Sequence, residues 1–112
     1  MDLFFASHNF TPPSDYVEFM RHSDGAEGNV GNAYLGIFGV QEMKKCNDVT
    51  QSLEPELLFF ATNLGGEGYA FDLAKAEVTI IAIELDTLDR TYADEMGSTL
   101  LEFLETLNGR HA

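Results

Sequence analysis

Residues 57–85 read LLFFATNLGGEGYAFDLAKAEVTIIAIEL, a stretch with three apolar runs separated by two turn signals. The runs, 57–62, 69–73 and 78–85, are rich in β-branched and aromatic residues, which favour strands. The segments between them, NLGGEG and AKAE, are typical of turns. We therefore predict an antiparallel meander, in which the third run is central because it is apolar on both faces through Ile83.

The middle run alternates as a half-buried strand does. Tyr69, Phe71 and Leu73 share one face, whereas Ala70 and Asp72 share the other. We expect the first face to be buried and the second to be the more exposed one.

The glycine cluster within this stretch raises the possibility of a phosphate-binding loop. GEGYAF, residues 66–71, matches two glycines of the dinucleotide fingerprint but has Phe71 at the third position, and the residues after it alternate as a strand rather than a helix. No Gly-Lys pair exists for a Walker-type loop. We therefore interpret Gly65, Gly66 and Gly68 as turn residues that supply positive φ in a hairpin connection.

The segment before the meander begins with a helix. Residues 12–22, PPSDYVEFMRH, start with prolines suited to a first helical turn and place Tyr16, Phe19 and Met20 on one stripe. The Gly- and Asn-rich residues 24–32 follow, and we predict a loop there.

The remaining segments complete an α+β pattern. Residues 34–38 predict a strand, 40–47 a short helix, and the polar stretch 86–96 no regular element. Ser98 is expected to cap a closing helix that ends at Asn108-Gly109, with an apolar stripe of Leu100, Phe103, Leu104 and Leu107. The prediction is one α+β domain over residues 1–112, with a mainly antiparallel sheet and N-terminal, middle and C-terminal helices.

The charge of the chain is strongly negative. Nineteen acids against six bases give a net charge of −13 over 112 residues. Nucleic-acid binding needs Lys and Arg against phosphates, so we exclude it, whereas a basic protein would be attracted. The alternative is that the acidity only maintains solubility.

Several features indicate a cytoplasmic protein. No apolar run approaches the roughly 18 residues of a membrane-spanning helix, and the N-terminus lacks a basic signal-peptide region. Cys46 is the only cysteine, which suits a reducing compartment. The apolar residues 3–6, LFFA, are expected to fold back onto the core rather than to pair with a second copy, and the oligomeric state stays open.

Candidate reactive groups are sparse. His8, His22 and His111 lie far apart, so no metal site or cofactor is expected, and His22 is expected to contact the carbonyls at its helix end. Cys46 follows two lysines that would lower its thiol pKa, but we favour a structural thiol. Two carboxylate pairs are candidates for acid–base work, although solvated or partner-facing carboxylates are the simpler reading: Glu54 with Glu56, and Glu84 with Asp86.

The order of motifs resembles the SUKH superfamily. PPSDYVEFM is similar to its first helix, SDGAEGNVGNAYLGIFGVQEM to its glycine-rich loop, strand and short helix, and ELLFFATNLGGEGYAFDL to its hairpin. VTIIAIELD and STLLEFLETL resemble the last strand and closing helix, so the resemblance covers residues 12–109. It implies a non-enzymatic domain. Many bacterial members are immunity proteins that neutralise a cognate toxin, often a nuclease, and fungal relatives regulate cell-wall synthesis.

The resemblance and the charge together predict an immunity protein that occludes a basic toxin domain. The expected charged rim consists of Asp24, Glu27, Asp48, Glu54, Glu56, Glu67 and Asp86. Tyr34 and Tyr69 are weaker candidates as anchors, since a core position is favoured for both, and Asp72 is expected to hold a turn. The alternatives are a scaffold or regulator that binds an endogenous protein, and an acid-using hydrolase with a carboxylate of raised pKa in a cleft.

Overall fold

A computed structural model describes residues 5, 10–50, 54–63 and 65–110. Six antiparallel strands form one sheet in the order β1-β2-β3-β4-β5-β6, so every strand pairs with its neighbour in sequence. The Cα radius of gyration, 12.9 Å, is that of one domain of about 100 residues. In chain order the elements are α2 (Ser14–His22), β1 (Ala26–Val30), β2 (Ala33–Ile37), α3 (Val40–Thr50), β3 (Leu57–Thr62), β4 (Glu67–Asp72), β5 (Ile80–Glu84), η1 (Arg90–Tyr92), β6 (Asp94–Gly97) and α4 (Leu100–Arg110).

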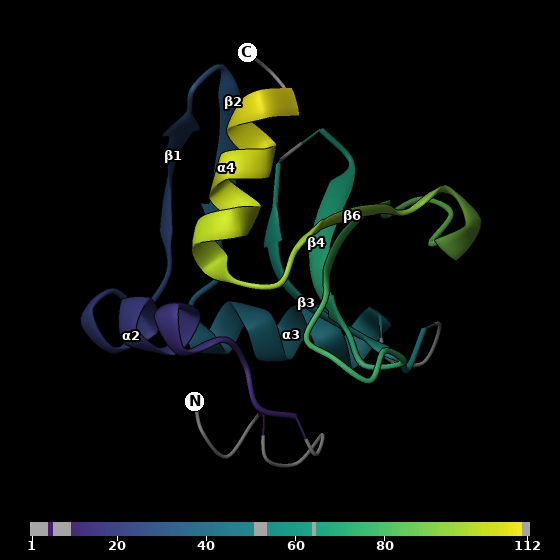
Figure 1. The fold of residues 1–112 in the computed structure, drawn as a ribbon. Coiled ribbons are helices and arrows are strands. Elements are labelled where there is room, and N and C mark those ends of the chain that lie inside the picture. Colours follow the sequence, from purple (N-terminus) through teal and green to yellow (C-terminus); the bar gives the residue numbers. More distant parts are fainter. Residues whose placement is uncertain (1–4, 6–9, 51–53, 64, 111–112) are drawn as a thin grey trace.

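The predicted meander is confirmed as β3, β4 and β5, and the α+β class with it. The helices predicted over 12–22 and 40–47 are confirmed as α2 and α3, although α3 continues to Thr50. The strand predicted over 34–38 is β2. Figure 1 shows α4 lying against the sheet, with α2 and α3 near one end of the strands.

Two strands contradict the sequence prediction. The segment 24–32 contains β1 rather than a loop, because Gly31 adopts φ +63° in a two-residue turn that pairs β1 with β2. The segment 86–96 contains η1 and the start of β6, which pairs with β5 and buries Met96. Pairing with a neighbouring strand outweighs the weak strand propensity of both segments.

The middle strands of the sheet are covered on both faces. Tyr69 and Phe71 of β4 belong to the main core, together with residues from α2, β2 and α4. Ala70 belongs to a smaller cluster on the opposite face, where Cys46 of α3 also packs. The expectation that β4 would be half-buried is therefore wrong, since α3 covers the second face and Asp72 is only 3% exposed.

Aromatic rings fill the centre of the main core. Phe60 and Phe71 stack with ring centroids 4.5 Å apart, and Tyr16 meets both rings edge-on. Phe5 is 2% exposed and lies against Tyr16 and Phe71, so this residue of the LFFA segment packs on the chain's own core. The other three residues of that segment lie outside the described part of the chain.

The start of α4 is capped differently from the prediction. The Thr99 hydroxyl, not that of Ser98, accepts the Glu102 N–H at 3.1 Å, while Ser98 donates through its N–H and hydroxyl to the Glu102 carboxylate. These two bonds lower the pKa of Glu102. Asp15 of α2 accepts the N–H groups of Leu100 and Leu101, at the start of α4, at 2.9 Å each, which joins the two helices. The helix then continues through Asn108-Gly109 to Arg110.

Candidate partner-binding surface

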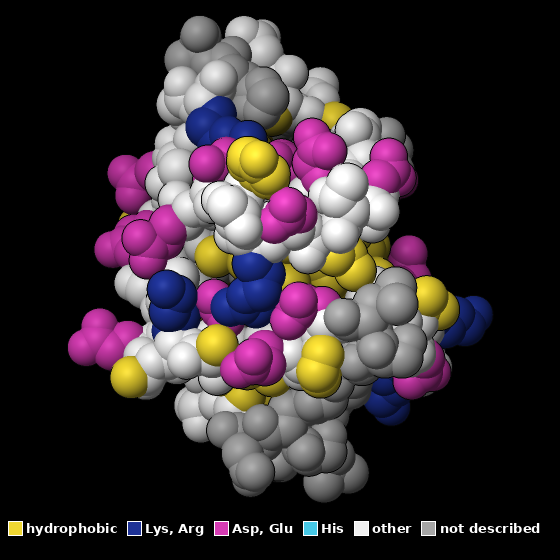
Figure 2. All heavy atoms as spheres, turned by 90° about the vertical axis from the view of Figure 1, so that its right-hand side faces the viewer, with side chains coloured by type: hydrophobic (Ala, Val, Ile, Leu, Met, Phe, Trp, Pro, Cys, Tyr) yellow, Lys and Arg dark blue, Asp and Glu magenta, His cyan; other side chains and the backbone are white. Residues whose placement is uncertain are grey.

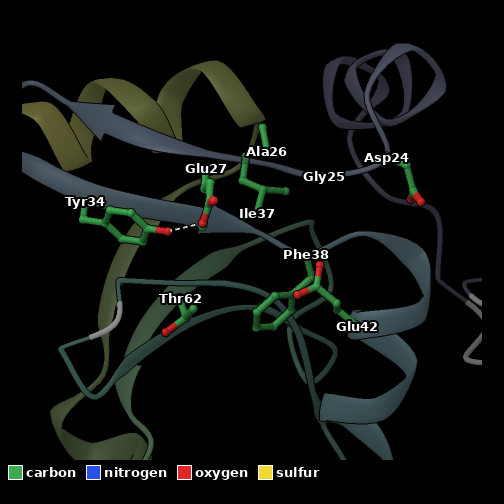
Figure 3. A pocket seen from close by; sticks show the side chains of 10 residues that line it. Asp24, Gly25, Ala26, Glu27, Tyr34, Ile37, Phe38, Glu42 and Thr62 are labelled. Carbon is green, nitrogen blue, oxygen red and sulfur yellow. Dashed lines mark hydrogen bonds between the residues drawn. The ribbon is translucent and has the colours of Figure 1, made fainter.

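The β1–β2 hairpin borders a hollow of about 360 Å³. In β2, Ala33, Leu35 and Ile37 belong to the main core, so Tyr34 and Gly36 point to the opposite face of the sheet. This second face is open beside β1, and its hollow is lined by Asp24, Gly25, Ala26, Glu27, Tyr34, Gly36, Ile37, Phe38, Glu42 and Thr62. Figure 3 shows these side chains around the space between the hairpin and the start of α3.

Three carboxylates of this hollow are held by the protein's own donors. Glu27 accepts the Tyr34 hydroxyl at 2.6 Å, a bond drawn in Figure 3, and it raises the pKa of Tyr34. Asp24 accepts the Val40 N–H at 2.9 Å and Glu42 the Gly39 N–H at 3.3 Å. A carboxylate has about four acceptor sites, so each retains capacity for a cationic donor.

The hollow brings together three of the predicted contact residues, Asp24, Glu27 and Tyr34. Glu42 completes the acidic set and was missed, although its place in the first turn of α3 was visible in the sequence. The hairpin is what creates this grouping, because it places Glu27 diagonally opposite Tyr34.

The other predicted contact residues lie elsewhere. Asp48 is exposed on α3, Glu56 is exposed before β3, and Asp86 is exposed after β5. Glu54 lies 3.5 Å from Arg90, and Glu67 lies 3.1 Å from Arg110.

Tyr69 is a core residue. Its side chain is 0% exposed and its ring meets Phe103 edge-on with centroids 4.9 Å apart. Burial, followed by the negative charge of Glu67, raises the pKa of Tyr69 to about 12. The hydroxyl has no hydrogen-bond partner among the described residues, so Glu67 acts on it by charge. Tyr69 is thus unavailable as a surface anchor.

The predicted turn residues divide into two kinds. Gly66 adopts φ +90°, as a turn glycine does, and the Asn63 side chain accepts the N–H groups of Gly65 and Glu67. Gly68 instead lies inside β4, where a Cβ would come within 2.8 Å of the Phe59 ring. The sequence prediction of a turn role was wrong for Gly68, because close packing and not positive φ requires that glycine.

Asp72 holds the turn after β4. Its carboxylate accepts the Ala74 N–H at 3.0 Å and receives Arg90 on both oxygens. The arrangement matches the structural role expected for this residue.

A second hollow, of about 530 Å³, lies near the far edge of the sheet. Glu67, Glu84, Asp89, Asp94 and Arg110 line it together with Tyr92, which is 80% exposed. Tyr92 was not among the predicted contact residues, although an aromatic residue in a polar stretch was a usable signal. Figure 2 shows the side of the molecule on the right of Figure 1, with Asp and Glu side chains spread over it and Lys and Arg among them.

Two of the candidate reactive groups, His22 and Cys46, have surroundings that the structure describes. His22 contacts Glu18 at 3.0 Å, rather than the helix-end carbonyls. Burial raises the pKa of the Cys46 thiol, which opposes thiolate formation. His8 and His111 lie outside the described residues.

Two kinds of feature are absent from the described residues. No group of three or more His, Cys, Asp and Glu side chains could hold a metal ion there. Nor does any described helix have the length and apolar character to cross a membrane.

Comparison with protein families identifies the family of this chain. Residues 4–106 match the SMI1 / KNR4 family (SUKH-1). The chain belongs to this family. No curated protein matches the chain. Membership of SUKH-1 is consistent with a binding protein of the immunity or regulatory type, and the match extends the resemblance seen in the sequence toward the N-terminus.

Proposed function

We propose that this SUKH-1 protein is an immunity protein that binds a basic toxin domain and neutralises it by occlusion. Family membership supports a binding role. The choice of a basic partner rests on how the charges are distributed over the surface, which is the observation that carries the proposal.

The acidic excess lies at the surface, whereas half of the bases are engaged by acids. The three arginines contact carboxylates: Arg21 contacts Glu18, Arg90 contacts Asp72, and Arg110 contacts Glu67. Most described acids are exposed, namely Glu18, Asp24, Glu27, Glu42, Asp48, Glu56, Glu77, Glu84, Asp86, Asp89, Asp94, Glu95, Glu102 and Glu105. The field outside the molecule is therefore negative, and it would accelerate the encounter with a basic protein.

A binding role fits the carboxylates of the first hollow better than acid–base catalysis does. Asp24, Glu27 and Glu42 each accept a hydrogen bond from the protein itself. Such bonds hold each carboxylate in place as a hydrogen-bond acceptor. Fixed acceptors suit the recognition of Lys and Arg.

Affinity capture tests the proposal. Tagged chain would be incubated with an extract of the source cells and with their medium, and then washed at low and at high salt. We expect a basic polypeptide to be retained at low salt and its binding to be weakened at high salt, because salt screens exposed charges. That polypeptide should arrest growth when expressed alone. Retention of endogenous, non-toxic proteins regardless of salt would instead support a scaffold or regulator.

A further inference from the structure

The two edges of the sheet differ in how they are protected. Strand β6 pairs with β5 at three residue pairs, with a register shift between Ile80 and Ile81. Strand β1 pairs with β2 at five pairs without a shift, and four of its five residues are exposed. Very short strands, irregular register, Pro and charged side chains, especially Lys, are the usual protections of an edge. Strand β1 is five residues long and has no Pro, no Lys and no register shift, and Glu27 is its one charged residue. Figure 1 shows β1 at the margin of the sheet.

The outer groups of β1 can be assigned from its turn. Gly31 and Asn32 form the two-residue connection, so Val30 and Ala33 are the hydrogen-bonded pair that closes the hairpin. Hydrogen-bonded and non-hydrogen-bonded pairs alternate along an antiparallel ladder. Glu27 and Asn29 are therefore in non-hydrogen-bonded pairs, and their main-chain N–H and C=O groups point away from β2.

The side chains next to this edge select the occupant. Glu27 and Asn29 lie on the same face as Tyr34, beside the hollow that also contains Asp24 and Glu42. An added strand would direct alternate side chains into that hollow. Lys or Arg there would meet three carboxylates. A second copy of this chain would instead bring another −13 of charge to the same place.

We propose that a basic, extended segment of the partner adds to β1 as a seventh strand. The inference rests on the proposed function and specifies the surface by which the toxin domain is recognised. Main-chain bonds to Glu27 and Asn29 supply the register, and the first hollow receives the basic side chains.

Asn29→Pro tests the main-chain part of the proposal. Proline at this position removes an outward N–H and leaves the pairs of the hairpin intact, which is where proline is tolerated on an edge strand. Asn29→Ala is the matched control, because it removes the same side chain but keeps the N–H. Circular dichroism and thermal unfolding would verify that both variants fold.

The probe is the basic polypeptide that the unmodified chain retains in the capture experiment, purified and titrated by calorimetry at low salt. We expect Asn29→Pro to bind at least about tenfold more weakly than Asn29→Ala. Amide exchange of the unmodified chain should show protection of the Glu27 and Asn29 N–H groups on binding.

Two triple variants, which differ in the position of the substituted carboxylates, keep the test valid if Asn29→Pro does not fold. Asp24→Asn, Glu27→Gln and Glu42→Gln together remove three charges beside β1 but preserve the acceptor oxygens. Glu84→Gln, Asp86→Asn and Glu95→Gln remove three charges at the other side of the sheet. The first set should slow association more than the second.

Each contrary outcome has its own meaning. Equal binding by both Asn29 variants, without protection of the two amides, would overturn the β1 inference and leave the proposed function standing. Equal slowing by the two charge sets would also overturn it. If β1 instead mediates self-association that Asn29→Pro abolishes, the occupant is a second copy and the inference fails. Capture of no basic polypeptide at all would overturn the proposed function, and this inference with it.

Discussion

Arg90 donates through Nη2 to both carboxylate oxygens of Asp72, at 2.7 Å each. The pair links the 3₁₀ helix η1 to the end of β4, across 18 residues of sequence. The two side chains differ in their access to water, since Arg90 is 31% exposed and Asp72 only 3%. Substitution of Arg90 and substitution of Asp72 should therefore destabilise the fold to different extents.

Arg90→Met should destabilise the fold more than Asp72→Asn. Removing the arginine leaves a buried carboxylate without its cation, for which we expect a loss of about 3 kcal/mol in the free energy of unfolding. Asp72→Asn leaves a partly solvated arginine and keeps an oxygen for the Ala74 N–H, so about 1 kcal/mol is expected. Urea unfolding of the two variants measures the difference. Equal losses in the free energy of unfolding would show that the difference in burial between Arg90 and Asp72 does not determine the cost of breaking the pair.

Asn47 should be essential for the position of α3. Its buried amide donates to the Phe59 and Met43 carbonyls at 2.9 and 2.8 Å, and its oxygen accepts the Phe59 N–H at 2.9 Å. Asn47→Leu would leave both main-chain groups of Phe59 without this partner, at a cost of about 3 kcal/mol. The exposed neighbour Asp48→Ala is the control and should change unfolding by less than about 0.5 kcal/mol. A small effect of Asn47→Leu in chemical denaturation would refute this role.

Two strand glycines should respond oppositely to alanine. In Gly68→Ala the new methyl group would press on the buried Phe59 ring, so a loss of about 2 kcal/mol is expected. At Gly28 no atom lies within 4 Å of a built Cβ, so Gly28→Ala should be neutral or slightly stabilising. Melting temperatures of the two variants provide the comparison. If Gly68→Ala melts at or above the temperature of Gly28→Ala, the packing argument is wrong.

Alkaline pH should destabilise the protein partly through Tyr69. Its pKa is raised from 10.0 to about 12 in the folded state, so between these values the unfolded chain loses the proton first. Stability is therefore fully present below pH 10 and falls as pH rises toward 12, by at most about 1.4 kcal/mol per pH unit. Tyr69→Phe should reduce this slope while leaving stability at pH 7 nearly unchanged, since the hydroxyl has no described hydrogen-bond partner. Urea unfolding at pH 8, 10 and 11 measures it, and an unaltered slope would contradict the assignment.

The sequence predicts the elements whose side chains form a hydrophobic pattern. Strands β3, β4 and β5 and the helices bury recurrent apolar residues, and these were located with small errors at their ends. Strand β1 has no such pattern, because its residues are Ala, Glu, Gly, Asn and Val and nearly all of them are exposed. The strand forms because it pairs with β2, and the strand propensity of its own residues does not predict that pairing.

The candidate surface was predictable in part for the same reason. Asp24, Glu27 and Tyr34 were selected individually from their residue types, but only the hairpin shows that they share a hollow. The burial of Ala70 could not be predicted from alternation alone, because its face of β4 is covered by α3, which docks on β3 through Asn47. Gly68 was predicted to be a turn glycine because the sequence does not show which residues pack against it. Phe59 and Leu85, from other segments of the chain, leave no room for a Cβ at this position.

Growth of cells that express the captured basic polypeptide, with and without this chain, tests whether the protein neutralises a toxin. We predict growth arrest by the polypeptide alone and recovery when the chain is co-expressed, with recovery reduced by the three substitutions at Asp24, Glu27 and Glu42. Continued arrest in the presence of the folded chain, or normal growth with the polypeptide alone, would contradict the proposal that this protein neutralises a toxin.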